Sequence, residues 1–156
     1  MPIRCEIVSQ DRMVFEGDAD IVIVPGEMGL MGILPKHAPL LSTLKFGILT
    51  VRSQGQEEHF TVAGGIVEVQ PDIITILADA AENVQEIDVA RAEAARRRAE
   101  EYIAKGPPPD SDTFLAMEAA LKRSNLRLQA ARRFGHGQGM PRLPGLDSTK
   151  DRGENN

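Results

Sequence analysis

Four arginines in the second half of the chain have the spacing of a cationic binding face. Arg91 and Arg98 lie seven residues apart, so on a helix they share a face with Asp88. Arg123 and Arg127 lie four residues apart and would share a face of a second helix. If the two helices fold back on each other, the guanidinium groups converge near Asp88 and repel one another. A polyphosphate would neutralise them through charge-assisted, often bidentate hydrogen bonds.

A plainer interpretation of the same arginines stays open. Runs of charge on a helix are usually a solvated face, and these side chains have acidic neighbours with which to pair. Those neighbours are Glu93, Glu100, Glu101 and Glu118. The spacing alone therefore does not decide between an anion site and a solvated surface.

The histidines give little support to a catalytic function. His37 lies between two prolines, with no Ser, Cys or carboxylate at the spacing of a catalytic triad. Because a general base needs a positioned partner, docking or turn structure is the better interpretation of this residue. The alternative is a small β-sandwich acid–base enzyme, a lyase or isomerase, that uses His37 or Tyr102. His37, His59 and His136 lack the spacing of metal ligands, so we expect no metal site.

A first helix, expected over residues 88–105, would carry two of the arginines. Asp88 is suited to be its N-cap, where the carboxylate accepts a backbone N–H and faces the positive end of the helix dipole. Gly106 and the prolines at 107–109 would end the helix in a stiff turn. Its apolar face is mainly alanine, at Ala92, Ala95 and Ala99. Since apolar burial contributes about 25 cal/mol per Å², an alanine-lined hairpin is weakly held and able to open.

A second helix is expected to begin with a cap at Ser111 or Asp112 and to run to about Phe134, with Gly135 beyond it. Apolar or small residues recur every three or four positions, which is the pattern of one seam against a partner helix. This seam comprises Phe114, Met117, Leu121, Ser124, Leu128 and Ala131.

The first 86 residues have the pattern of short strands, and no segment between these strands has the periodicity of a helix. Glycines and prolines separate the strand patterns, and residues 54–56 resemble a hairpin tip. The expected strands are residues 3–8, 20–24, 46–52, 59–63, 65–69 and 72–78. Cys5 alternates with isoleucines and is expected to be a buried strand thiol. The pattern predicts a β-sandwich or barrel followed by an antiparallel helical hairpin, an α+β fold.

Charge and composition divide the chain into three parts. Residues 1–87 carry a net charge of −8 and residues 88–134 a net charge of +3, within a total of −5. The charges of residues 135–156 balance, and this glycine- and proline-containing stretch is expected to be a disordered tail. The predicted parts are a β-domain at 1–86, a helical hairpin at 87–134 and a tail at 135–156.

Composition argues against two other classes of protein. The acidic net charge and the scarcity of aromatic residues beside the arginines oppose a nucleic-acid-binding module. We find no leader pattern, and the longest apolar runs fall far short of the ~20 residues of a membrane span. We therefore expect a soluble, intracellular protein.

Three motifs together resemble the epsilon subunit of F-type ATP synthases. Residues 29–41 (GLMGILPKHAPLL) look like the signature loop of that family, and residues 63–69 (AGGIVEV) resemble its second block. Residues 88–92 (DVARA) resemble the start of its first helix. The order and spacing fit over residues 1–134. The prolines at 107–109 and the long tail depart from the usual pattern.

The resemblance implies a flattened β-sandwich, a helical hairpin and a non-catalytic role in the rotor stalk of a proton-translocating enzyme. The sandwich would dock on the gamma subunit and the membrane-embedded c ring, on the cytoplasmic face of the membrane and without inserting into it. The helices would fold down, or extend toward the alpha and beta catalytic subunits and inhibit ATP hydrolysis.

The resemblance also implies roles for particular residues. In some bacterial members, the hairpin holds ATP as a sensor ligand, and no cofactor is required. The matching positions here are Ile87, Asp88, Arg91, Arg98, Arg123 and Arg127, with Glu82 and Ala92 less diagnostic. We further expect a rotor contact at Met28, Leu30, Met31 and His37. Contact with a catalytic subunit is expected at Arg123, Arg127, Arg132 and Arg133.

Overall fold

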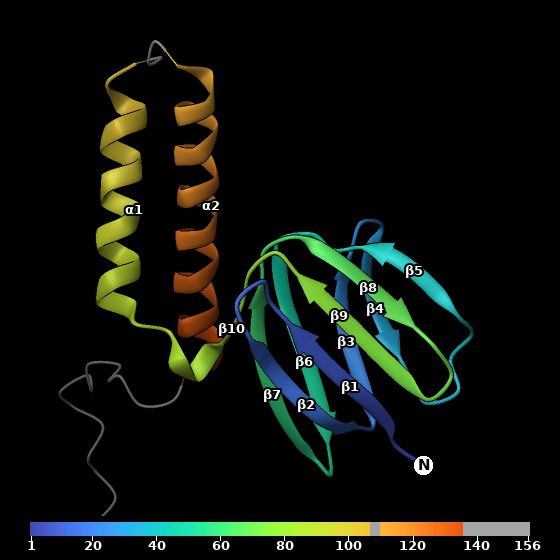
Figure 1. Cartoon of the computed structure of the whole chain (residues 1–156). Coiled ribbons are helices and arrows are strands. Elements are labelled where there is room, and N and C mark those ends of the chain that lie inside the picture. The colour runs from blue at the N-terminus through green and yellow to red at the C-terminus, as the bar shows by residue number, and fades with distance from the viewer. Residues whose placement is uncertain (107–109, 136–156) are drawn as a thin grey trace, which may run out of the picture.

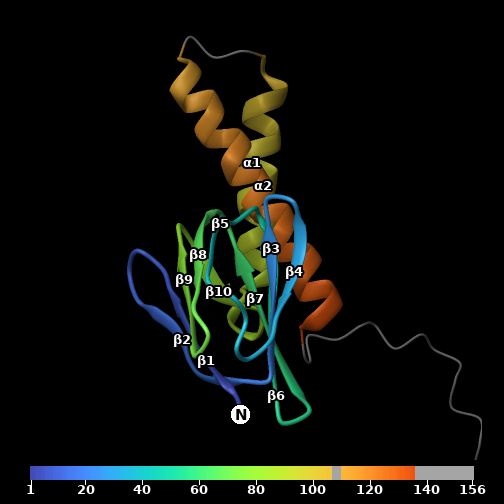
Figure 2. The same ribbon diagram turned by 90° about the vertical axis from the view of Figure 1, so that its right-hand side faces the viewer.

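Two five-stranded sheets and a helical hairpin make up the protein, seen in a computed structural model that describes residues 1–106 and 110–135 (Figure 1). The first sheet has the order β2-β1-β9-β8-β5 and is antiparallel except for the β1–β9 pair. Its strands are β1 (Ile3–Val8), β2 (Met13–Ala19), β5 (Leu40–Thr43), β8 (Gly65–Val69) and β9 (Ile73–Ala78). The two sheets face each other as a β-sandwich (Figure 2).

The second sheet is antiparallel throughout and has the order β10-β7-β6-β3-β4. Its strands are β3 (Ile21–Gly26), β4 (Gly29–Ile33), β6 (Gly47–Ser53), β7 (Gln56–Val62) and β10 (Ala81–Asn83). Gln54 and Gly55 form the predicted hairpin tip between β6 and β7, and both have positive φ. The expected β-sandwich is confirmed.

The core lies between the sheets and contains aliphatic side chains with one aromatic ring at its centre. Alternate residues of β1 point inward, so Ile3, Cys5 and Ile7 are fully buried. Phe60 of β7 is also fully buried and meets Phe15 edge to face at 5.5 Å. Burial raises the pKa of the Cys5 thiol to about 12, which keeps it protonated and unreactive, as expected for a buried strand thiol.

Four strands were missing from the sequence-based expectation: β2, β4, β5 and β10. Each of them is the edge strand of its sheet. An edge strand has one neighbour and needs fewer inward apolar residues, so its sequence carries a weaker alternation. The motif at 29–41, expected to be a loop, contains β4 and the beginning of β5.

The hairpin follows a short 3-10 turn, η1 (Val84–Glu86), and consists of α1 (Val89–Ala104) and α2 (Ser111–Phe134). Asp88 caps α1 as expected, because its carboxylate accepts the backbone N–H of Arg91 at 3.1 Å. The expected cap of α2 at Ser111 or Asp112 is wrong. Asp110 is the N-cap, since its carboxylate accepts the Asp112 N–H. Its hydrogen bond from the Thr113 hydroxyl is the main reason that the pKa of Asp110 is lowered.

The helices pack along the predicted seam, but α2 has a second contact face. Ser124 and Leu128 of the seam are buried, as are Ala92 and Ala99 of α1, and the two helices are in contact. Ala130, which lies off the seam, is also fully buried. This differs from the expectation of one seam because the C-terminal half of α2 also packs on η1 and β7.

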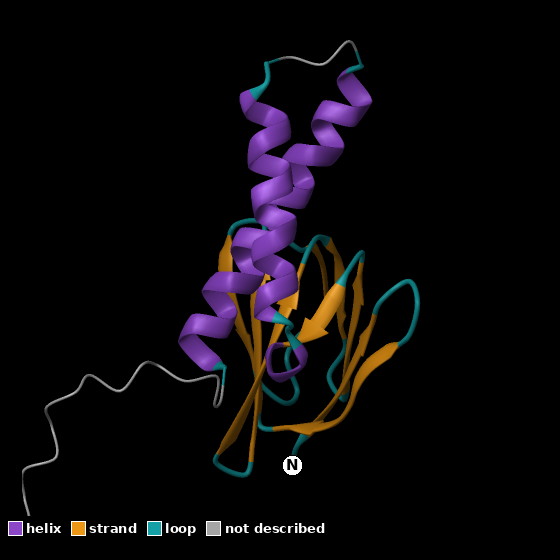
Figure 3. Ribbon diagram, turned by 90° about the vertical axis from the view of Figure 1, so that its left-hand side faces the viewer, coloured by secondary structure: helices purple, strands orange, loops and turns teal. Residues whose placement is uncertain are grey.

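The lower half of the hairpin lies beside the sandwich, whereas its upper half projects beyond the sheets (Figures 1 and 3). In this arrangement α2 lies between α1 and the sandwich (Figure 1). The prolines at 107–109 and the predicted tail, apart from Gly135, fall outside the described residues. Neither α1 nor α2 has the length and apolarity to cross a membrane, which holds for every helix in the described part of the chain.

Candidate functional site

The candidate site is the junction at which the C-terminal half of α2 meets β7, β10 and η1. Three side chains are buried there, Val84, Ile87 and Ala130. Half-buried apolar residues surround them: Ile48, Ala131 and Phe134. This cluster is far smaller than the core of the sandwich, so apolar burial holds the hairpin only loosely.

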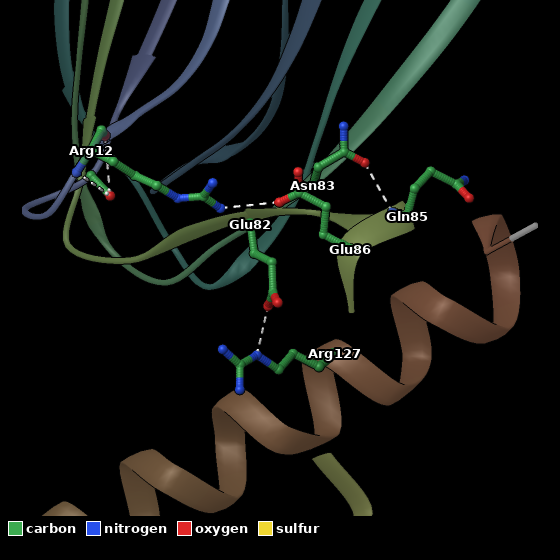
Figure 4. Close-up of polar contacts among 7 residues, drawn as sticks. Arg12, Glu82, Asn83, Gln85, Glu86 and Arg127 are labelled. Carbon is green, nitrogen blue, oxygen red and sulfur yellow. Dashed lines mark hydrogen bonds and ion pairs between the residues drawn. The ribbon is translucent and has the colours of Figure 1, made fainter. Parts of the chain in front are cut away.

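An ion pair lies beside this cluster. Glu82 extends from edge strand β10 toward Arg127 on α2, and the Arg127 Nε lies 2.8 Å from the Glu82 Oε2 (Figure 4). Glu82 is held in place because β10 pairs with β7, where Thr61 is its partner. The Glu82 Oε2 is buried, and its contact with Arg127 does not have the geometry of a hydrogen bond. The two side chains therefore interact as an ion pair.

A second ion pair tethers η1 without involving the helices. The Arg12 Nη2 lies 3.1 Å from the Glu86 Oε2 (Figure 4). The Asn83 side chain accepts the Gln85 N–H at 2.9 Å and thereby caps the 3-10 turn. These contacts fix the connector on the sandwich, so motion of the hairpin would begin after η1.

A small cavity brings together three of the residues predicted to bind ATP: Glu82, Arg123 and Arg127. Its volume is about 50 Å³, whereas pockets for small molecules have roughly 300–1,000 Å³. The cavity is therefore too small for a nucleotide, and the predicted ATP site would need the open surface beside it.

The other residues of the predicted ATP site have varied positions. Ile87 is buried in the junction and Asp88 caps α1. Ala92 is buried in the helix seam. Arg91 and Arg98 are exposed, each one residue before a buried alanine of α1, and neither lines the small cavity. The structure thus assembles one part of the predicted set around Glu82 and leaves the two α1 arginines on the surface.

The last residue of α2 makes a contact that sequence reasoning missed. The Phe134 ring stacks on the His59 ring of β7, with centroids 3.8 Å apart and planes 17° apart. The Phe134 carbonyl accepts a hydrogen bond from the Gln85 side chain at 2.9 Å. No local pattern could have revealed this pair, because His59 and Phe134 belong to elements far apart in the sequence.

His59 is almost covered at this contact, with 13% of its side chain exposed. Its Nδ1 lies 3.0 Å from the Thr50 hydroxyl, and its Nε2 lies 3.5 Å from a Glu57 oxygen. Burial lowers the pKa of His59 below its ordinary value, Glu57 opposes this shift, and Arg133 adds to it. The imidazole is therefore held in its neutral form.

The predicted rotor contact divides into exposed and packed residues. Met28 and Leu30 lie at the β3–β4 turn and are 99% and 73% exposed. Met31 instead packs against the core of the sandwich. His37 is half-buried, and its Nδ1 lies 2.8 Å from the carbonyl of Ala38.

The cationic residues at the end of α2 face mainly solvent. Arg132 and Arg133 are exposed, and the Arg133 guanidinium lies 4.9 Å from the centroid of the Phe134 ring. Higher on the helix, the Lys122 ammonium lies 4.5 Å from the centroid of the Phe46 ring. Within the described residues, no group of three His, Cys, Asp or Glu side chains could hold a metal ion.

Comparisons with known proteins cover almost all of the described chain. Residues 2–84 match the family model described as "ATP synthase, Delta/Epsilon chain, beta-sandwich domain", and residues 85–132 match "ATP synthase, Delta/Epsilon chain, long alpha-helix domain". The ATP synthase epsilon chain of Laribacter hongkongensis is 46% identical over 130 residues, which is 82% of this chain and 91% of the relative. That of Bacillus licheniformis is 46% identical over 130 residues, 83% of this chain and 98% of the relative.

Chains in solved structures of ATP synthases have a similar fold. A chain in the Euglena gracilis mitochondrial ATP synthase (OSCP/F1/c-ring) matches with a TM-score of 0.68 and 25% identity, over 84% of this chain and 81% of that chain. A chain in the central stalk and c-ring of the Tetrahymena thermophila mitochondrial enzyme shares the fold, with a TM-score of 0.55, 14% identity and coverage of 83% and 96%. The alternative of a lyase or isomerase finds no support among these relatives.

Proposed function

The chain belongs to the ATP synthase delta/epsilon family, and we propose that its helical hairpin is a releasable inhibitor carried on a rigid docking module. It is an epsilon subunit of the ATP synthase central stalk. In the proposed division of work, the sandwich attaches the subunit to the rotor and the hairpin regulates the enzyme. The subunit itself performs no catalysis and needs no cofactor.

The sandwich is suited to docking because its core is complete without the hairpin. All residues of the main core lie between Ile3 and Ala78. The module therefore keeps its shape whatever the helices do. Its partners in the proposal are the gamma subunit and the c ring, on the cytoplasmic face of the membrane. The exposed Met28 and Leu30 at the β3–β4 turn offer an apolar contact for one of them.

The weakness of the junction is the observation that carries the proposed release. The contacts of α2 with the sandwich and η1 are few: one small apolar cluster, the partly exposed Glu82–Arg127 pair, and single contacts made by Phe134 and Lys122. Arg127 and Glu82 have 44% and 23% of their side chains exposed, and ion pairs at exposed positions contribute roughly 0–1 kcal/mol. The hairpin can therefore leave the sandwich at a low free-energy cost.

Once released, α2 would present its arginines to the catalytic subunits. Arg123, Arg127, Arg132 and Arg133 are all exposed to some degree in the docked hairpin. On release, Arg127 loses Glu82 and needs a new anionic partner. Acidic segments of the alpha and beta subunits are the proposed partners, and this contact would block ATP hydrolysis.

ATP is the proposed ligand of the docked state. The matching residues are Ile87, Asp88, Arg91, Arg98, Arg123 and Arg127, with Glu82 and Ala92 beside them. A ligand that binds only the docked hairpin stabilises it by mass action. Abundant ATP would therefore keep the hairpin docked, and scarcity of ATP would release it.

Truncation of the subunit tests the inhibitory function. An ATP synthase assembled with residues 1–87 alone should keep the subunit on the rotor and hydrolyse ATP faster than the enzyme with the full chain. Subunit content, measured by quantitative immunoblotting of the purified complex, is the control for docking. Equal hydrolysis by the two complexes, with equal subunit content, would show that the hairpin does not inhibit.

A further inference from the structure

The last residue of α2, Phe134, makes two contacts beyond the apolar junction. The Phe134 ring stacks on His59, and its carbonyl accepts the Gln85 side-chain hydrogen bond. Both contacts must break before α2 can leave β7 and η1. Neither contact is needed by the core of the sandwich.

Charged groups approach His59 from two elements. Glu57 and Glu58 of β7 and Arg133 of α2 line the same open pocket of about 630 Å³ at this end of the helix. The uncharged groups around the ring are Thr50 of β6, Asn83 of β10, Gln85 of η1 and Phe134 of α2. Docking of α2 thus brings one cation and one covering aromatic ring to the histidine.

We propose that His59 and Phe134 form a proton-sensitive clasp, closed when the imidazole is neutral and opened by its protonation. A proton on the docked ring would place a positive charge on a side chain that is only 13% exposed and that lies near Arg133. These two costs oppose the attraction between an imidazolium and the stacked Phe134 ring. When α2 lifts, the ring regains water and loses the Arg133 charge but keeps Glu57. Protonation therefore favours the released hairpin.

The direction of the pH effect follows from the same groups. Burial lowers the pKa of His59 in the docked state, whereas the released histidine would titrate nearer its ordinary value of 6.5. Docking is therefore undiminished well above pH 6.5 and weakens as the pH falls through 6.5 toward the docked pKa. Below the docked pKa, no further loss is expected. A link between acidification and inhibition rests on the proposed function, but the clasp itself does not.

The clasp can be tested on the full chain in solution. Spin labels at two exposed residues, Gln56 on β7 and Gln129 on α2, report the docked distance by electron paramagnetic resonance. Between about pH 8 and about pH 5, the ratio of docked to released hairpin should fall by roughly threefold or more. The His59→Gln variant should show no such fall. His37→Gln, which changes a histidine outside the junction, should behave like the unchanged chain.

NMR titration of the His59 ring gives an independent readout. Phe134→Ala removes the ring that covers the imidazole, so the pKa of His59 should rise toward 6.5. An unchanged pKa, or the same pH-dependent opening in His59→Gln, would overturn the clasp. Failure of the truncation experiment in the assembled enzyme would overturn inhibition while leaving this result in place.

Discussion

Glu82 and Arg127 face each other across the joint between β10 and α2, with the Arg127 Nε 2.8 Å from the Glu82 Oε2. One partner belongs to the sandwich and the other to the hairpin, so the pair is made only while the hairpin is docked. Arg127 also belongs to the predicted ATP site and to the predicted contact with a catalytic subunit. Exchange of anionic partners at Arg127 is therefore the local event on which the regulatory account depends.

The first prediction concerns this ion pair. Glu82→Gln should weaken docking of the hairpin by up to about 1 kcal/mol, because it removes a partly exposed charge pair. Native-state hydrogen exchange of the α2 amides would measure the loss. Glu86→Gln is the matched control, since Glu86 pairs with Arg12 and not with a helix. Equal exchange in both variants would contradict a docking role for Glu82.

The second prediction concerns the buried alanine of the junction. Ala130 is fully buried beside Val84 and Ile87, so Ala130→Leu would overpack this cluster at a cost of about 1–3 kcal/mol. The hairpin should lift while the sandwich stays folded, and the assembled enzyme should hydrolyse ATP more slowly. Ala116→Leu, on an exposed position of α2, should have no such effect. Faster or unchanged hydrolysis in Ala130→Leu would count against the inhibitory hairpin.

The third prediction concerns Gly65, which belongs to the motif at 63–69. Gly65 has a φ of +118°, and an added Cβ would collide with the Leu77 carbonyl oxygen. Gly65→Ala should therefore lower the free energy of unfolding by about 2 kcal/mol or more, measured by urea denaturation. Gly55→Asn should cost less than about 1 kcal/mol, because the turn leaves open space there and Asn tolerates positive φ. Similar losses in the two variants would refute this steric explanation.

The fourth prediction concerns ATP. The Arg91→Ala/Arg127→Ala double variant of the full chain should bind ATP at least about tenfold more weakly, since each lost guanidinium removes a charge-assisted hydrogen bond. Isothermal titration calorimetry would measure the affinity. Arg97→Ala/Arg132→Ala removes the same charge from two exposed positions outside the predicted site and should retain the affinity. Equal ATP affinity in the unchanged chain and the first variant would exclude the predicted site.

The central strands were predictable because each has a neighbouring strand on both sides and a run of apolar residues in its sequence. The patterns at residues 3–8 and 72–78 mark β1 and β9, which pair at the centre of the first sheet. The edge strands were not predictable, because β2 and β10 carry polar residues that one-sided pairing tolerates. Asp88 was predicted correctly as the N-cap of α1. Asp110, which follows the prolines, is the N-cap of α2, where Ser111 or Asp112 was expected.

The candidate site was predictable only in part. The spacing of Arg123 and Arg127 predicted that they share a face of α2, because helical periodicity is a local property, and both line the same small cavity. The partner of Arg127 depends on how β10 lies against the helix, which no local pattern specifies. The stack of Phe134 on His59 depends on the same tertiary arrangement.

The distance between Gln56 and Gln129, measured in the assembled ATP synthase with and without ATP, shows whether the hairpin leaves the sandwich. We expect two populations of this distance, a docked one favoured by ATP and a longer one favoured without it. A single docked distance under both conditions would contradict a releasable hairpin.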